Sequence, residues 1–191
     1  MAKDLTEIRW HGRGGQGAKT AATMVAEVAL EEGKYSQGFP EYGPERMGAP
    51  IRGYTRIASE PIRLHCPITA PDVVVILDAT LIGADDLADG LKPNGAIIVN
   101  TPESPAAIRK RLGVRHGKVY TVDATTIAIE TIGRPIPNTP MIGALLRVSG
   151  FMKLETVFHD IEKKFLKKLG AAVVQGNITA VQRAYQEVQG E

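Results

Sequence analysis

Apolar residues recur along the chain with two different periods, and these periods predict alternating strands and helices. A first strand is expected at Glu7–His11, where Ile8 and Trp10 lie on the same side. A helix is expected at Ala18–Glu32, because its apolar residues recur at helical spacing. Gly33 stands where a helix commonly ends in a left-handed residue.

Residues 35–53 have no hydrophobic period and contain four glycines, three prolines and three aromatic residues. This composition predicts a long irregular loop, and loops of this length in compact domains are usually functional when they are ordered. The aromatic residues argue against disorder. A hairpin is expected next, with strands at Tyr54–Ala58 and Ile62–His65 around the turn Ser59-Glu60-Pro61.

Alternation of strands and helices then continues to the end of the chain. Buried strands are expected at Asp72–Leu77, Gly95–Asn100 and Val119–Val122. Helices are expected at Asp85–Leu91, Ser104–Leu112, Asp123–Ile132, Met141–Gly150, Leu154–Leu169 and Asn177–Gln189. Ser104, Asp123 and Thr139 are the expected caps of three of these helices.

Apolar strands separated by helices are typical of a largely parallel sheet that is covered on both faces. The sequence therefore predicts an α/β fold, a Rossmann-like three-layer α/β/α sandwich with a mostly parallel central sheet. No internal repeat or linker interrupts the pattern, so a single domain over residues 1–191 is expected. Ligands and partners are expected at the carboxyl ends of the strands.

Composition narrows the classes of function. The chain has 191 residues and a net charge of +2, which is too small to indicate nucleic-acid binding. The most apolar stretch, Val73–Leu77, is far shorter than the roughly 20 residues that span a membrane. The amino-terminal residues do not resemble a signal peptide, and Cys66 is the one cysteine, so the cytoplasm is the expected compartment.

The expected first strand and first helix are joined by a glycine-rich turn with the pattern G-x-G-x-x-G. Such a turn can place a phosphate at the helix N-terminus. The acid that would bind a ribose is missing, because Glu31 and Glu32 fall on the expected helix. Three interpretations stay open: a tight structural turn, a phosphate contact, and dinucleotide binding by a stand-alone NAD(P)-dependent dehydrogenase. The candidate cofactor-binding residues are Gly12, Arg13, Gly14, Gly15, Gln16 and Gly17.

No conventional catalytic set accompanies this turn. The four histidines have no metal-ligand spacing, no G-x-S-x-G motif is present, and one cysteine cannot ligate an iron–sulfur cluster. The residues by themselves therefore predict a domain with no self-sufficient active site, no catalytic residue and no metal ligand.

Three segments together resemble the gamma subunits of pyruvate:ferredoxin oxidoreductase and its 2-oxoacid relatives. They are EIRWHGRGGQGAKTAA at residues 7–22, FPEYGPERMGAPIRGYTRI at residues 39–57, and VDATTIAIETIGRPIPNTPMIGALLRVSG at residues 122–150. The resemblance covers essentially the whole chain. The sequence ERMGAP at residues 45–50 is most similar to the pyruvate type, although Tyr42, Pro44 and Met47 depart from its commonest form. A branched-chain 2-oxoacid, 2-oxoisovalerate, stays open as the substrate.

The resemblance implies that this chain works with alpha, beta and delta subunits and holds no cofactor alone. Thiamine diphosphate with Mg and the [4Fe–4S] clusters would lie in the partner subunits. The assembly would convert pyruvate and coenzyme A to acetyl-CoA and reduce ferredoxin, or run in reverse. Neither nucleic acid nor a membrane is implied as a partner.

What remains for the gamma subunit is assembly and a part in the site that coenzyme A approaches. The glycine turn is the candidate for a contact with coenzyme A or another phosphate. The segment 39–53 is the candidate for docking, with aromatic and charged side chains that suit an interface. The candidate interface residues are Phe39, Tyr42, Glu45, Arg46 and Arg52. The alternative for Glu45 and Arg46 is that they pair with each other and stiffen the loop.

Overall fold

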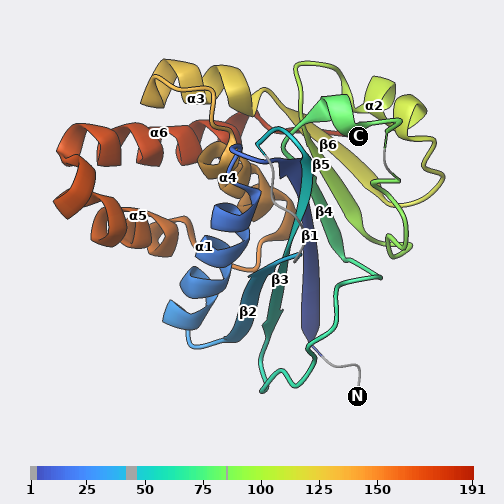
Figure 1. Ribbon diagram of the computed structural model, residues 1–191, viewed down its shortest axis with the longest axis horizontal. Helices are drawn as coiled ribbons and strands as arrows, with labels where there is room; N and C mark the ends of the chain where they lie inside the picture. Colours follow the sequence, from blue (N-terminus) through green and yellow to red (C-terminus); the bar gives the residue numbers. More distant parts are fainter. Residues whose placement is uncertain (1–3, 42–46, 85) are drawn as a thin grey trace.

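The protein was analysed as a computed structural model that describes residues 4–41, 47–84 and 86–191. Its centre is a seven-stranded mixed sheet with the order β2-β3-β1-β4-β5-β6-β7 (Figure 1). The strands are β1 (Leu5–Arg13), β2 (Tyr35–Pro40), β3 (Pro50–Ala58), β4 (Val73–Ile76), β5 (Ala96–Asn100), β6 (Lys118–Val122) and β7 (Gln189–Gly190). The helices are α1 (Ala18–Glu31), α2 (Pro105–Leu112), α3 (Ala124–Ile132), α4 (Asn138–Ser149), α5 (Leu154–Leu169) and α6 (Ala171–Glu187), with a short 3-10 helix, η1, at Ala79–Leu81.

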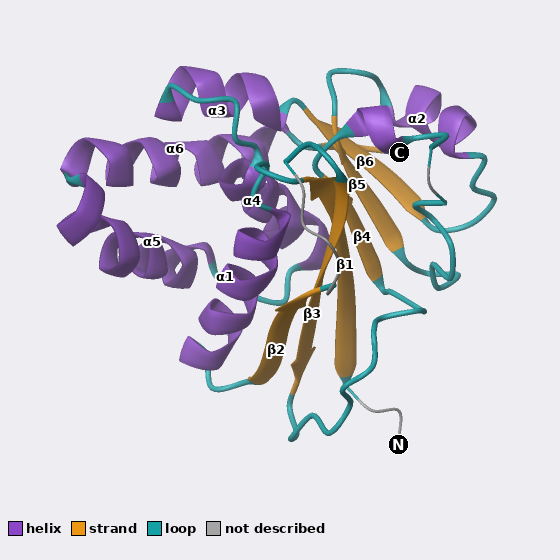
Figure 2. Ribbon diagram, in the orientation of Figure 1, coloured by secondary structure: helices purple, strands orange, loops and turns teal. Residues whose placement is uncertain are grey.

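Helices cover both faces of this sheet (Figure 2). Helices α1, α3, α4, α5 and α6 gather over one face, and α2 with η1 lies over the other (Figure 1). Strand β4 illustrates the arrangement, because Val73 and Val75 belong to the first core and Val74 and Ile76 to the second. A strand that is buried on both faces reads as a continuous apolar run. The predicted three-layer α/β/α fold is confirmed.

Most strands run in one direction. β1, β4, β5 and β6 form a parallel set, and β3 pairs antiparallel with both β1 and β2. β2 therefore points the same way as β1, although β3 separates the two. β7 closes the other edge by antiparallel pairing with β6. The mostly parallel sheet is confirmed, with β3 and β7 as its two reversed strands.

The prediction of an irregular loop over residues 35–53 was wrong at both ends. Residues 35–40 form β2, and β3 begins at Pro50 rather than at Tyr54. The glycines that suggested a loop let α1 lie close to the sheet. A Cβ at Gly38 would stand 2.8 Å from the carbonyl oxygen of Ala22, and one at Gly53 would stand 3.2 Å from the Ala22 side chain. Glycine in a strand often marks such a close approach.

The expected strand Ile62–His65 is absent, because this segment crosses the face of the sheet. Gln37 Nε2 donates to the carbonyl of Ile62 at 3.4 Å, and Arg56 Nη2 donates to the carbonyl of Cys66 at 2.8 Å. β3 takes its hairpin partner from β2 instead.

The expected helix Asp85–Leu91 is also wrong within residues 86–91, which form turns; Asp85 itself lies outside the described residues. Arg9 Nη2 donates to the carbonyls of Leu87 at 3.1 Å and Asp89 at 2.7 Å. These carbonyls therefore bind a buried guanidinium group instead of continuing a helical ladder.

Two of the three predicted caps are confirmed. Ser104 accepts a hydrogen bond from the Ala107 N–H, and Asp123 accepts one from the Thr126 N–H. The prediction for Thr139 was wrong, because α4 already begins at Asn138 and places Thr139 in its first turn. The next proline remains compatible with helix there, since N–H groups of the first turn have no helical acceptor.

Helix α6 begins at Ala171, six residues before the expected start at Asn177, and ends at Glu187. Gly33 follows α1 with φ of 76°, as expected for a residue that ends a helix. Within the described residues, no helix has both the length and the apolar character required to cross a membrane.

Candidate functional site

The carboxyl ends of the parallel strands meet at one edge of the sheet and form a polar cleft. At this edge the chain leaves β1 toward α1, on one side, and β4 toward η1, on the other. Open α/β sheets commonly bind ligands at such a divergence. The cleft has a volume of about 280 Å³ and is lined by Gln16, Leu77, Asp78, Ala79, Thr80, Asn100, Thr101, Pro102, Asp123 and Thr125.

Two glycines of the turn after β1 adopt conformations that favour glycine. Gly15 has φ of 98° and Gly17 has φ of 84°. A Cβ at Gly17 would also stand 2.6 Å from Asn138 Nδ2, whereas the space around Gly15 is open. Gly17 therefore lets the turn pack against the start of α4.

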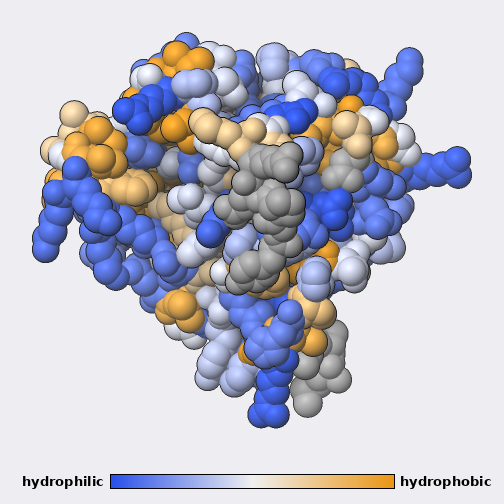
Figure 3. Space-filling view, viewed as in Figure 1, coloured by the Kyte–Doolittle hydropathy of each residue, from blue (hydrophilic) through white to orange (hydrophobic). Residues whose placement is uncertain are grey.

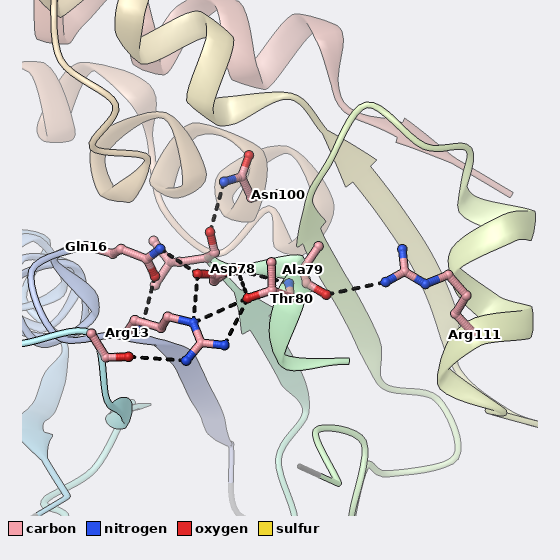
Figure 4. A network of polar contacts seen from close by, with 9 residues as sticks. Arg13, Gln16, Asp78, Ala79, Thr80, Asn100 and Arg111 are labelled. Carbon is pink, nitrogen blue, oxygen red and sulfur yellow. Dashed lines mark hydrogen bonds and ion pairs between the residues drawn. The ribbon is translucent and has the colours of Figure 1, made fainter. Parts of the chain in front are cut away.

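Arg13, the last residue of β1, extends across the edge toward the end of β4 (Figure 4). Its Nε lies 3.2 Å from Asp78 Oδ2, and its Nη2 donates to Thr80 Oγ1 at 3.0 Å. Its Nη1 donates to the carbonyl of Gly48 at 3.2 Å. The guanidinium group thus joins three segments that are far apart in the sequence.

Gln16 joins the same network from inside the turn (Figure 4). Its Nε2 donates to Asp78 Oδ2 at 2.7 Å, and its Oε1 accepts from the backbone N–H of Arg13 at 2.7 Å. Burial opposes ionisation of Asp78, but hydrogen bonds from Thr80 and Gln16 and the charge of Arg13 outweigh it. The net effect holds the pKa of Asp78 below its usual range. Asp78 is therefore a carboxylate at neutral pH.

The glycine turn is also bonded to the segment that precedes β3. The N–H of Gly14 donates to the carbonyl of Ala49 at 2.9 Å, and the N–H of Gly48 donates to the carbonyl of Gly14 at 3.1 Å. The structure thus brings two separately predicted sites together: the turn at residues 12–17, and residues 48–49 of the segment 39–53.

These contacts change the interpretation of the turn as a phosphate site. The N–H groups of Arg13, Gly14 and Gln16 all donate within the protein. The N-terminus of α1 is different, since Gly17 caps it without a side-chain hydrogen bond. A phosphate contact by this turn would therefore rely chiefly on the first N–H groups of α1, with the exposed Lys19 beside them.

Sequence reasoning did not identify Asn100 as a residue of this edge. Its Nδ2 donates to the carbonyl of Leu77 at 2.9 Å and to Thr125 Oγ1 at 2.8 Å, and its Oδ1 accepts from the Thr125 N–H. Asn100 thus connects the ends of β4 and β5 to the start of α3. The sequence did contain a signal for this role, because Asn100 is a polar residue at the end of an apolar strand.

Of the candidate interface residues, Phe39 and Arg52 are described, and Tyr42, Glu45 and Arg46 lie outside the described residues. The Phe39 ring lies 5.2 Å from the Tyr54 ring, centroid to centroid, and the Arg56 guanidinium lies 5.6 Å from its centre. Arg52 Nε lies 3.8 Å from a carboxylate oxygen of Glu41. Both side chains therefore already have partners within the single chain.

The structure gives a physical argument against dinucleotide binding. An acid, Glu41, does follow β2, the strand after α1. β3 lies between β2 and β1, however, so two interstrand spacings, about 10 Å, separate the two strands. In the dinucleotide fold the ribose-binding acid ends the strand beside β1.

Among the described residues, no group of three or more His, Cys, Asp and Glu side chains could hold a metal ion. Cys66 is exposed, in the segment that crosses β2 and β3. The carboxylates at the carboxyl edge instead accept hydrogen bonds from protein groups, as Asp78 and Asp123 do.

Comparison with known proteins gives a consistent result over nearly the whole chain. Residues 7–187 match the family described as pyruvate ferredoxin/flavodoxin oxidoreductase. The chain is 50% identical to the pyruvate synthase subunit PorC of Thermotoga maritima over 188 residues, which cover 98% of this chain and 97% of that protein. It is 45% identical to the pyruvate/ketoisovalerate oxidoreductases common subunit gamma of Pyrococcus furiosus, over 97% of this chain and 98% of that protein.

A solved structure agrees with these sequence relatives. The crystal structure of the pyruvate oxidoreductase subunit PORC from Thermotoga maritima superposes with a TM-score of 0.88 and 46% sequence identity, covering 99% of each chain. Sequence and fold are thus shared from one end of the chain to the other. On these grounds the chain belongs to the pyruvate ferredoxin/flavodoxin oxidoreductase family.

Proposed function

We propose that this chain is the gamma subunit of a cytoplasmic pyruvate:ferredoxin oxidoreductase and works with alpha, beta and delta subunits. The observation that carries the proposal is the near-full-length likeness, in sequence and in fold, to a pyruvate synthase subunit. The complex would convert pyruvate, coenzyme A and two oxidised ferredoxins to acetyl-CoA, carbon dioxide, a proton and two reduced ferredoxins, or run this reaction in reverse. Partner subunits would hold thiamine diphosphate, Mg and the [4Fe–4S] clusters.

A second candidate is the same role in a 2-oxoisovalerate enzyme. One observation favours it: the Pyrococcus furiosus relative is named as a gamma subunit common to the pyruvate and the ketoisovalerate enzymes. By analogy, the choice of 2-oxoacid would rest with the partner subunits, and this gamma subunit would support either. Reconstitution with each set of partners, assayed with pyruvate and with 2-oxoisovalerate, distinguishes the two candidates.

Within the complex, we assign the contact with coenzyme A to the glycine turn, residues 12–17. The N-terminus of α1 offers N–H groups to a phosphate, and Gly17 leaves this terminus without a capping side chain. Arg13 keeps about one third of its side chain exposed beside the cleft, so it can add positive charge. The glycine turn would therefore bind the phosphates through Arg13 and the first N–H groups of α1, and it would leave the reacting thiol to the partner subunits.

Docking is assigned to the segment 39–53. Met47 lies in this segment with 94% of its surface exposed. The next residue, Gly48, is hydrogen-bonded to Gly14 of the glycine turn. A large apolar side chain at the carboxyl edge gains free energy when a partner covers it. Phe39 and Arg52 would form the rim of this contact, since Phe39 already packs against Tyr54 and Arg52 already pairs with Glu41.

The test is reconstitution. The purified chain should have no turnover and no iron or thiamine absorbance, and it should restore activity when added to a preparation of the other subunits. Turnover by the chain alone, or full activity of the other subunits without it, would contradict the proposal.

A pair of variants tests the docking surface. Met47→Glu should raise the concentration of this chain that gives half-maximal restoration about tenfold or more, as expected for loss of a central apolar contact. Leu169→Glu is the matched control, because Leu169 is also exposed but lies at the end of α5, where apolar atoms gather away from the carboxyl edge (Figure 3). Equal effects of the two variants would argue against docking through residues 39–53.

A further inference from the structure

Asp78 occupies a central place in the network at the carboxyl edge. One carboxylate oxygen accepts from Gln16 Nε2 at 2.7 Å and lies 3.2 Å from Arg13 Nε. The other accepts from the Thr80 N–H at 2.9 Å and from Thr80 Oγ1 at 2.6 Å. Both oxygens are therefore used, and they join the end of β1, the glycine turn and η1 (Figure 4).

These contacts fix the direction of the Arg13 side chain. Asp78 holds Nε, and Thr80 Oγ1 accepts from both Nε and Nη2, at 3.3 and 3.0 Å. Because the guanidinium group is planar, its remaining nitrogen then points to the carbonyl of Gly48. The orientation of Asp78 is thereby transmitted to the segment that leads into β3.

The segment at residues 47–49 depends on this support. Two backbone hydrogen bonds, Gly14 to Ala49 and Gly48 to Gly14, hold it to the turn. Met47 is almost fully exposed beside these bonds, and Gly48 has open space around it. Each of these two backbone hydrogen bonds contributes little net stability, about 1 kcal/mol. The ion pair of Asp78 and Arg13 adds a further restraint on residues 47–49, because Arg13 also donates to the carbonyl of Gly48.

We propose that Asp78 is a positioning residue: through Arg13 and Gln16 it holds the glycine turn and residues 47–49 in one shared arrangement. The coenzyme contact and the docking contact then form together on a single preorganised surface. The identity of these two contacts rests on the proposed function, whereas the positioning does not. A consequence is linkage, because a ligand that orders one segment stabilises the other and strengthens its binding.

Hydrogen exchange on the full-length chain tests the positioning directly. In Asp78→Asn the side-chain oxygen can still accept from the Thr80 N–H. The amide N–H₂ group then faces Gln16 and Arg13, in place of the carboxylate oxygen that accepts from Gln16 and pairs with Arg13. The amides of Gly14 and Gly48 should exchange about tenfold faster. This corresponds to a decrease of about 1.4 kcal/mol in the free energy of local opening. Amides of the central strand β4 should keep their rates.

A control variant makes the result specific. Asp123→Asn is the matched control, because Asp123 is also an acid at this edge but caps α3 through Thr126. It should leave Gly14 and Gly48 unchanged. Unchanged Gly14 and Gly48 rates in Asp78→Asn, or equal acceleration in Asp123→Asn, would overturn the proposal.

Kinetics of the reconstituted complex connect the positioning to its consequence. Asp78→Asn should raise the apparent KM for coenzyme A several-fold and leave KM for pyruvate and kcat near their original values. Faster exchange with an unchanged KM for coenzyme A would support the positioning and contradict the assignment of the coenzyme contact to the turn. The exchange measurement thus tests the positioning by Asp78, and the kinetic measurement tests the coenzyme A contact independently of it.

Discussion

At the scale of single residues, the candidate site depends on a few side chains that each have several partners. Asp78, Arg13 and Asn100 connect strand ends that the sequence separates by dozens of residues. Gly17 belongs with them, since its missing side chain makes room for Asn138. The conformation of the edge is thus fixed by specific contacts and not by glycine flexibility.

The first prediction concerns Gly17. Gly17→Ala should destabilise the chain more than Gly15→Ala, although both residues have positive φ. The backbone cost is about 1–2 kcal/mol at either position, and at Gly17 the overlap with Asn138 adds about 1–3 kcal/mol. Urea unfolding measures both free energies. Asn138→Ala in the Gly17→Ala background should recover part of the loss, and equal effects at the two glycines would contradict the account.

The second prediction concerns Asp160, a buried acid on α5 whose Oδ2 lies 2.7 Å from Lys164 Nζ. Burial raises the pKa of Asp160 above its ordinary value, and the charges of Glu31 and Glu27 add to this, although Lys164 opposes it. When the folded-state pKa of a carboxyl group lies above its unfolded-state pKa, the protonated group stabilises the folded chain. This contribution is fully present below the unfolded-state pKa and is lost as the pH rises through the folded-state pKa. At neutral pH the ionised group is therefore a net cost.

Asp160→Asn should accordingly unfold at the same or a higher temperature than the original chain at pH 7. This advantage should shrink as the pH is lowered toward 4, because the acid then becomes protonated in the folded state. Lys164→Met is the contrasting variant: it leaves the buried acid without its cation and should cost about 3 kcal/mol or more. Thermal unfolding from pH 4 to 8 follows both variants, and a large loss for Asp160→Asn at pH 7 would refute the interpretation.

At the scale of elements, the notable feature is the insertion of β3 between β1 and β2. This antiparallel strand is joined to its neighbours by buried polar contacts as well as by the ladder. Thr55 Oγ1 accepts from Trp10 Nε1 at 3.1 Å and donates to the carbonyl of Ala22 at 2.8 Å. One hydroxyl thus ties β3 to β1 and to α1, inside the larger core.

The third prediction tests that link. Thr55→Val keeps the shape of the side chain but leaves a buried indole N–H and a buried carbonyl without their partner, at a cost of about 2–4 kcal/mol. Thr55→Ser keeps the hydroxyl and removes one methyl group, at a cost of about 1 kcal/mol. Denaturant unfolding should therefore rank Ser above Val in stability. The reverse order would mean that packing, and not the hydroxyl, holds β3 in place.

The elements also explain where sequence reasoning failed. Periodicity located β1, α1, β4, β5, β6 and α5, because each contains enough residues facing one core. It missed β2 because Gly38 and Pro40 interrupt the pattern, and it placed a strand at 62–65 because no local signal distinguishes a strand from an extended crossing segment. These outcomes depend on which surface each segment meets, and that surface lies elsewhere in the sequence.

At the scale of the whole molecule, a polar cleft lies at the carboxyl edge of the sheet, and the one cysteine of the chain, Cys66, is exposed. Among the described residues no cluster of ligands could hold a metal. If partner subunits hold the redox centres, as proposed above, the Cys66 thiol is dispensable for electron transfer.

The fourth prediction follows. Cys66→Ser should leave the iron content and the ferredoxin-reducing activity of the reconstituted complex unchanged, since one thiol cannot ligate an iron–sulfur cluster alone. The structural effect should also be small, because Arg56 bonds to the backbone carbonyl of Cys66 and this carbonyl is retained. Iron analysis and a reduction assay measure the result. A proportional loss of iron would show that this chain contributes a ligand.

The sequence by itself determined the fold class, the order of most elements and two helix caps, because hydrophobic period and local hydrogen bonding are encoded within a few residues. Its three motif segments also indicated the family before any comparison. Only the tertiary structure placed β3 between β1 and β2 and turned Arg13 toward Asp78 and Gly48. Those features include contacts between segments up to 67 residues apart, and no local pattern specifies which distant groups meet.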